Sequence, residues 1–204
     1  MRLIIASLTA AVIVFIACNE NTGIKKAQAD DIATIRNMEK EELVARGRYL
    51  VTVAGCGDCH SPKILTPHGP EIDTTRILSG HPANSPLPPL NATATQPGQW
   101  ASMSPDITAF AGPWGISFAA NLTPDSATGI GAWSEEIFIK TLRTGKHLGA
   151  DNGRPILPPM PWPFTGQMTD QDLSAVYAYL RSLPPINNRV PAPIPPNEVK
   201  TVSK

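Results

Sequence analysis

The chain has 204 residues, in which 17 basic side chains balance 17 acidic ones, so its formal net charge is zero. A chain without a basic excess lacks the electrostatic footprint of a nucleic-acid-binding protein, and we exclude that class of ligand. The length predicts one domain with extensions. Charged residues make up 17% of the chain, and its 22 prolines and 15 glycines predict a loop-rich fold with modest regular structure.

Residues 1–17 predict an export signal of the lipoprotein type. Arg2 supplies a minimal positive start, and the apolar run after it is too short for a membrane span but suits a signal peptide. The run ends in a small residue followed by Cys18, as in a bacterial lipobox, although Phe15 stands where leucine is usual. We expect cleavage before Cys18 and acylation of its sulfur. An uncleaved anchor and an ordinary signal peptide are the alternatives, and all three place the rest of the chain outside the cytoplasm.

A polar segment and then a helix follow the signal. Residues 18–37 carry few large apolar side chains and predict a flexible tether. The folded part is expected to begin near Met38, and the apolar residues that recur there at helical spacing are Leu43, Leu50, Val51 and Ala54. Gly47 lies within this helix, where glycine costs about 1 kcal/mol relative to alanine. We therefore predict that another helix crosses closely at Gly47, with a tolerated surface glycine as the alternative.

The stretch Cys56-Gly57-Asp58-Cys59-His60 carries the clearest chemistry in the chain. Two cysteines three positions apart with a histidine directly after them form the attachment pattern of a c-type haem. On a helical turn both sulfurs lie on one face, within reach of the two vinyl groups on one porphyrin edge, and the imidazole can bind the iron. A Cys-x-x-Cys pair alone is also typical of a redox dithiol or half of a zinc site. No second cysteine pair completes a zinc site, so we expect one covalently bound haem c, which would also supply apolar core.

Helical periodicity disappears between residue 61 and about residue 130. Prolines recur throughout this segment and forbid long helices and interior strands. A structureless loop of this length is rare in a compact domain. We expect a long Pro/Gly-rich insertion that wraps around the porphyrin with short strands or turns.

Two further helices are predicted after the insertion. Ser134 is a good N-cap for the first, and Gly145 fits the left-handed position that ends it. The last helix starts at Thr169, with Asp172 completing a capping box, and a Pro-Pro pair stops it. Residues 191–204 form a Pro-rich tail that either lies extended on the surface or dangles.

The second axial ligand decides what a haem iron can do. Besides His60, the side chains able to bind iron are Met103, Met160, Met168, His68, His81 and His147. Met160 is preferred because four nearby prolines stiffen its loop, and a weak thioether ligand needs a rigid loop. Met168 borders the last helix and is interpreted as a core or capping contact. His/Met ligation fills both axial positions, which suits one-electron transfer and disfavours the binding of peroxide or oxygen.

Several motifs spread over residues 40–190 share the pattern of one family. Besides the haem motif, they are Gly47–Leu50, Asn121–Asp125, Gly129–Gly131 with Trp133, Leu142–Gly145, Pro158–Trp162 and Tyr177–Pro184. With them the chain resembles class I c-type cytochromes, and more narrowly the single-haem domains of periplasmic dehydrogenase cytochrome c subunits. The resemblance implies an all-α fold over residues 38–190, in which the first and last helices cross, and it implies His60 and Met160 as axial ligands. The chain departs from these subunits, which often carry three haem domains, because it has one attachment motif.

The resemblance also suggests roles for residues around the porphyrin. Trp133 and Arg143 are expected to donate to a haem propionate, and Trp162 to pack on the ring edge. Ordinary core or surface roles are the alternative for each. A proline carbonyl soon after His60, that of Pro62 or Pro67, is expected to accept the imidazole N–H and fix its tautomer.

The function that follows is that of a non-catalytic electron carrier. We expect a one-electron shuttle between a dehydrogenase and a terminal oxidase or another cytochrome, in the periplasm or cell envelope and anchored to a membrane through lipidated Cys18. A haem enzyme or sensor, such as a peroxidase or a sulfur-compound oxidase, is the alternative, and it requires an open or exchangeable sixth ligand. An assembly subunit with a structural haem is a third possibility.

Overall fold

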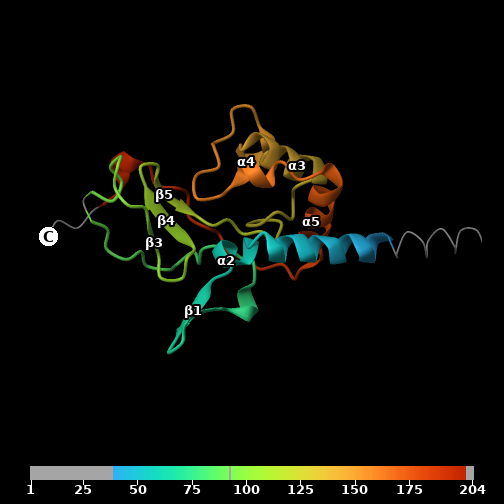
Figure 1. The fold of residues 1–204 in the computed structure, drawn as a ribbon, viewed down its shortest axis with the longest axis horizontal. Coiled ribbons are helices and arrows are strands. Elements are labelled where there is room, and N and C mark those ends of the chain that lie inside the picture. Colours follow the sequence, from blue (N-terminus) through green and yellow to red (C-terminus); the bar gives the residue numbers. More distant parts are fainter. Residues whose placement is uncertain (1–38, 92, 201–204) are drawn as a thin grey trace, which may run out of the picture. The chain divides into compact units, whose positions relative to one another are not determined.

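The computed structural model describes residues 39–91 and 93–200. The predicted signal peptide (residues 1–17), Cys18 and the tether (residues 18–37) lie outside the described residues and stay predictions. From Lys40 on the chain forms one compact unit, whose elements are labelled in Figure 1. Within the described part of the chain, no helix combines the length and the apolar character needed to cross a membrane.

The first described helix, residues 39–53, leads into the short helix α2 (Cys56–His60), as Figure 1 shows. Gly55 lies between them at φ 66° and ψ 24°, a left-handed conformation that glycine adopts without steric cost. Leu50 and Val51 of the first helix are buried in the core. The haem motif is therefore attached to a helix that the core holds in place.

Helix α5 (Asp170–Ser182) crosses the first helix at Gly47. A Cβ atom at Gly47 would lie 1.9 Å from the carbonyl oxygen of Ala175 and 2.7 Å from the Cβ of Tyr179. No side chain fits in this space, so the predicted close crossing of the first and last helices is confirmed.

The start of α5 departs from the predicted capping box. The Thr169 side chain accepts a hydrogen bond from the backbone N–H of Asp172, as an N-cap should. The Asp172 carboxylate, however, accepts a hydrogen bond from Arg46 of the first helix at 3.0 Å. The capping box therefore has its Thr169 hydrogen bond but not the reciprocal one, because the Asp172 carboxylate pairs with Arg46 on the crossing helix.

Helix α3 (Glu135–Thr144) begins and ends as predicted. The Ser134 side chain accepts a hydrogen bond from the N–H of Ile137, and Gly145 adopts φ 65° and ψ 24° at the C-terminal end. The 3-10 turn η2 (His147–Gly149) follows, and the one-turn helix α4 (Trp162–Thr165) packs beside α3. These three helical segments lie on the chain between the insertion and α5.

The insertion contains strands, so the prediction of an all-α fold was too narrow. In chain order its elements are β1 (Lys63–Thr66), β2 (Gly69–Ile72), the 3-10 turn η1 (Thr74–Arg76), β3 (Ser102–Met103), β4 (Ala109–Gly112) and β5 (Gly115–Phe118). Strands β1 and β2 form an antiparallel hairpin, and β3, β4 and β5 form an antiparallel sheet in that order. None of these strands is longer than four residues. Pro62 and Pro67 bound β1 and Pro113 follows β4, where a proline cannot donate to the ladder.

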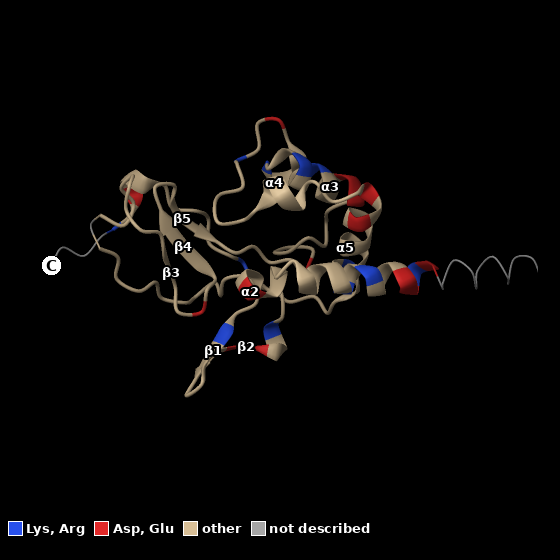
Figure 2. Ribbon diagram, in the orientation of Figure 1, with Lys and Arg blue, Asp and Glu red and all other residues tan. Residues whose placement is uncertain are grey.

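The sheet β3–β4–β5 is the apolar part of the insertion. Its central pair has the register Ala109↔Phe118 and Gly112↔Gly115, with Pro113 and Trp114 in the turn. Figure 2 shows that charged residues gather along the first helix, α3 and α5, whereas this sheet carries none. Strands β4 and β5 are largely buried, whereas both residues of β3 are exposed.

The C-terminal segment lies along the sheet. Ile194 and Ile116 exchange two backbone hydrogen bonds, of 2.8 and 2.9 Å, and the 3-10 turn η3 (Pro196–Glu198) contacts β5. The outer edge of β5 is thus paired with the last described part of the chain.

One apolar core unites the helices with the segments between them. Its buried members are Leu50, Val51, Leu78, Ile130, Phe138, Leu142, Leu173, Ala175, Val176 and Leu180. Cys56, Leu122, Trp133, Met160, Met168 and Tyr177 pack against it and are partly buried. Residues from the haem motif and from the Met160 loop therefore meet the same core.

Candidate haem site

Cys56 and Cys59 lie one turn apart on α2 and are half-buried free thiols. Burial raises the pKa of both thiols; for Cys59 the nearby Lys63 ammonium opposes this rise. The structure thus presents two protonated, unbridged sulfurs from one helical turn, which is the arrangement that attachment to adjacent vinyl groups needs.

The His60 imidazole is held by a backbone carbonyl from the far end of the insertion. Its Nδ1 lies 2.8 Å from the carbonyl oxygen of Ala120, two residues after β5. Burial lowers the pKa of His60, which favours the neutral ring. A neutral ring that donates through Nδ1 keeps the Nε2 lone pair for a metal.

The predicted proline partner of this imidazole was wrong. The carbonyl of Pro62 accepts the backbone N–H of Asp73 at 2.9 Å, and Pro67 lies in the turn between β1 and β2. Pro62 is buried directly before β1, and the β1–β2 hairpin that contains Pro67 leads away from α2 in Figure 1. The imidazole donates instead to the carbonyl of Ala120.

Met160 lies in the loop between η2 and α4 and is partly buried against the core. The carbonyl of Pro158 accepts a hydrogen bond of 2.5 Å from the hydroxyl of Ser117, on β5. Met160 and Cys56 therefore share one core although they are far apart in sequence.

The two predicted tryptophans flank this loop. The indole of Trp162 covers Gly145, where an added Cβ would lie 2.3 Å from the ring. Trp133 packs edge-on against His147, with ring centroids 5.7 Å apart. Its backbone carbonyl accepts the hydroxyl of Tyr177 at 2.7 Å. Both rings are half-buried next to the core, and their contacts with haem stay predictions.

Arg143 uses its guanidinium within the protein. It donates to the carbonyl of Gly166 and pairs with Asp170 at 2.6 Å. These contacts join α3 to the start of α5. The guanidinium has five N–H donors, so these two bonds do not exclude the expected contact with a propionate, which stays a prediction.

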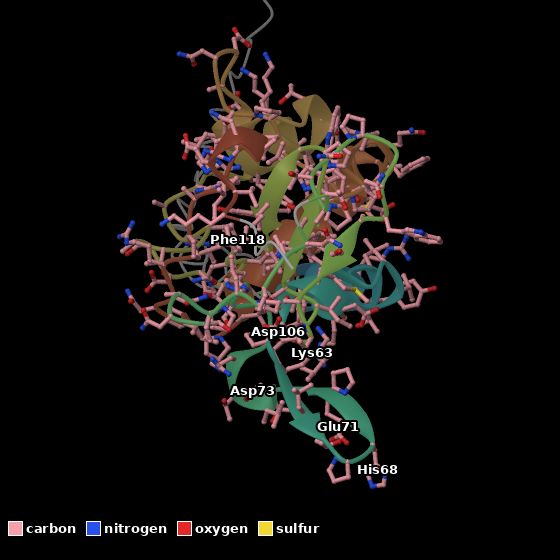
Figure 3. All side chains as sticks on the ribbon, turned by 90° about the vertical axis from the view of Figure 1, so that its left-hand side faces the viewer. Lys63, His68, Glu71, Asp73, Asp106 and Phe118 are labelled. Carbon is pink, nitrogen blue, oxygen red and sulfur yellow. The ribbon has the colours of Figure 1, made fainter. Side chains whose placement is uncertain are left out.

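The other candidate iron ligands lie in less suitable places. Met103 is 61% exposed on β3, and Figure 3 shows His68 at the tip of the β1–β2 hairpin. His81 is buried, and its Nδ1 lies 2.7 Å from the Thr108 hydroxyl. Met168 packs against the core beside α5. Among the described methionines, Met160 alone combines partial burial with a loop held by the insertion.

A groove of about 820 Å³ lies on the insertion side of the domain. Its walls include Lys63, Arg76, Asp106 and Arg189, and Figure 3 shows Lys63 and Asp106 near the base of the hairpin. Cys56, His60 and Met160 do not line this groove. The polar hollow is therefore separate from the donor set described above.

Sequence reasoning missed the residues that hold the site together. Ala120 acts through its backbone and leaves no side-chain signature, and Ser117 is a single serine in a short strand, between Ile116 and Phe118. Asn121 did carry a signal, because it opens the Asn121–Asp125 motif. Its side chain accepts the N–H of Thr123 and donates to the carbonyl of Ile186 at 2.8 Å. It thereby joins the end of the insertion to the chain after α5.

The donor set fits a covalently attached haem. It supplies two free thiols on one turn, a neutral imidazole with its Nδ1 engaged, and a thioether against the same core. Within the described residues there is no group of three or more His, Cys, Asp or Glu side chains that could hold a metal by themselves.

Comparison with known proteins gives a consistent result. The family model for cytochrome c matches residues 44–184. The gluconate 2-dehydrogenase cytochrome c subunit of Pantoea cypripedii is 32% identical over 153 residues, which cover 75% of this chain and 24% of the relative. The cytochrome c subunit of the quinone-dependent alcohol dehydrogenase of Gluconacetobacter polyoxogenes is 30% identical over 146 residues, or 70% of this chain and 25% of the relative.

A third relative is the fructose dehydrogenase cytochrome subunit of Gluconobacter japonicus, 28% identical over 137 residues, or 67% of this chain and 20% of the relative. The chain thus spans a quarter or less of the length of the three cytochrome subunits that it matches. The family model covers well over half of the chain, and its match includes both the haem motif and Met160. The chain belongs to the cytochrome c family and is an electron-transfer cytochrome with covalently bound haem c.

Proposed function

We propose that Cys56 and Cys59 hold the haem through thioether bonds and that His60 and Met160 are its axial ligands. The observation that carries the proposal is the convergence of the haem motif and the Met160 loop on one core. The insertion supports both sides, because Ala120 binds the imidazole and Ser117 binds the loop before Met160. The roles of Trp133, Arg143 and Trp162 around the porphyrin belong to the same proposal.

The chain's own residues suit electron transfer better than catalysis on a bound substrate. Bound haem supplies the reversible one-electron chemistry of its iron. The His60 imidazole and the Met160 thioether would fill both axial positions of the iron, and Met160 is partly buried against the apolar core. A filled coordination sphere gives peroxide or oxygen no open position, which opposes the enzyme and sensor alternatives.

The proposed physiological role is a one-electron shuttle from a dehydrogenase to a terminal oxidase or another cytochrome. It is supported by the relatives, which are named as cytochrome subunits of gluconate, alcohol and fructose dehydrogenases. We further propose that the chain is exported and anchored through a lipid on Cys18. The apolar run before Cys18 supports this.

The decisive experiment compares Met160→Ala with Met168→Ala in purified holoprotein. Met168 is the matched control because it is also partly buried against the same core. The ferric wild type should show the weak far-red charge-transfer band of a sulfur–iron bond. Met160→Ala should lose this band and lower the reduction potential, and Met168→Ala should keep both.

Loss of the band in Met168→Ala alone would move the axial ligand to Met168. A wild type without the band and with a high-spin spectrum would favour the enzyme or sensor alternative. Acid-acetone extraction tests attachment separately, since thioether-linked haem stays with the protein and non-covalent haem is released.

A further inference from the structure

Strand β5 and the residues after it contact both sides of the proposed haem site. The Ser117 hydroxyl donates to the carbonyl of Pro158 at 2.5 Å, and the carbonyl of Ala120 accepts from His60 at 2.8 Å. Ser117 is 6% exposed, and its oxygen also accepts the indole N–H of Trp114 at 3.2 Å. The carbonyl of Phe110 is a second acceptor at 3.5 Å, so the shorter contact with Pro158 is the stronger hydrogen bond of this hydroxyl.

The loop around Met160 has few other means of attachment. Pro158, Pro159 and Pro161 carry no backbone N–H, so they cannot donate to any neighbour. Among the described residues, the bond from Ser117 is the single hydrogen bond that reaches residues 157–160. Backbone bonds resume on either side, where Ile156 donates to Gly145 and Pro161 accepts from Phe164.

We propose that Ser117 is a positioning residue, which holds the Met160 thioether where it can bind the iron. The inference rests on the proposed function, because it needs Met160 as the ligand. It gives the insertion a role: its sheet fixes the weaker of the two axial ligands. A thioether binds iron weakly, so small losses of loop order should release it.

The test measures how tightly added imidazole displaces the native sixth ligand from the ferric holoprotein. Ser117→Ala should tighten imidazole binding roughly tenfold, the effect of losing one buried hydrogen bond. It should also lower the intensity of the far-red band at room temperature. Ser117→Cys has a side chain of similar size with a weaker donor, and it should tighten imidazole binding about threefold. It serves as the test if the alanine variant does not incorporate haem.

Ser104→Ala is the matched control. Ser104 is buried in the same insertion, but its hydroxyl donates to Asp106 at 2.5 Å and does not reach the Met160 loop. Its imidazole affinity should equal that of the wild type even if its thermal stability falls. A merely structural role for Ser117 predicts that both serine variants behave alike.

Two results separate the positioning role from the ligand assignment. If Met160→Ala raises imidazole affinity but the Ser117 variants do not, the positioning role is wrong and the ligand assignment stands. If Met160→Ala leaves the band and the affinity unchanged, the proposed ligation itself fails.

Discussion

Arg46 and Asp172 join the two crossing helices through an ion pair of 3.0 Å, at the place where Gly47 lets their backbones meet. The Arg46 side chain is 52% exposed and that of Asp172 is 23% exposed. Solvent screening makes such pairs weak, about 0.5 kcal/mol. The crossing should therefore depend on the fit at Gly47 far more than on the charges beside it.

Gly47→Ala should destabilise the folded protein by about 3 kcal/mol, because the new methyl group overlaps the Ala175 carbonyl and the helices must separate. Denaturant unfolding of the holoprotein measures the change. Ala45→Ser, at an exposed position of the same helix, is the control. Equal stabilities of the two variants would contradict the close crossing.

The Arg46–Asp172 pair should contribute less than about 1 kcal/mol, and its contribution should shrink as salt is added. A double-mutant cycle with Arg46→Gln and Asp172→Asn isolates the coupling energy. The cycle is needed because the N–H of Asp172 also binds the Thr169 side chain in the helix cap. A coupling above about 2 kcal/mol that resisted salt would mean that the pair is effectively desolvated.

Asn121→Ala should cost about 2 kcal/mol of stability, since it leaves the buried N–H of Thr123 and the carbonyl of Ile186 without this partner. Asn91→Ala is the control: Asn91 accepts the N–H of Thr93 in the same kind of turn, but it is exposed. We expect the control to change the free energy of unfolding by a few tenths of a kcal/mol. Similar losses in both variants would show that burial at Asn121 is unimportant.

Asp106 should make the stability of the insertion depend on pH in the acid range. Burial raises the pKa of its carboxyl group, but hydrogen bonds from Ser104 and Thr108 together with His81 outweigh this, and the net pKa lies below its ordinary 3.8. A lowered pKa means that the stabilisation is complete above about pH 3.8 and is lost as the pH falls through the lower, folded-state value.

Asp106→Asn should therefore be less stable than the wild type at neutral pH, and the difference should narrow in acid. Urea unfolding at several pH values measures both proteins. Asp151→Asn, in an exposed loop, is the control. A difference that stayed constant down to about pH 2 would exclude the carboxylate as the stabilising group.

Local signals in the sequence predicted those parts of the fold that depend on neighbouring residues. Ser134 and Gly145 mark the ends of α3 because caps act within one turn. Gly47 predicted a close helix crossing because glycine destabilises a helix relative to alanine, and a close contact explains why a side chain is absent there. The haem motif predicted its own helical turn, α2, for the same kind of local reason.

Contacts between distant segments were not predictable in this way. The partner of His60 is the carbonyl of Ala120, sixty residues away, and any residue type presents the same carbonyl. From the sequence, the carboxylate of Asp172 was expected to accept the backbone N–H of Thr169. In the packed structure it binds Arg46 of the crossing helix instead. Strands of two to four residues give too little alternation to be located in the sequence, so the insertion was expected to hold only short strands or turns and the fold class was expected to be all-α.

The pairing of Ile194 with Ile116 has a practical consequence for anyone who shortens this protein. Trimming the chain before residue 191 would strip β5 of its only outer neighbour in the described fold and leave a bare, uncharged strand border. Such borders recruit strands from other molecules. A truncated version should then self-associate and precipitate, even with its haem ligands intact.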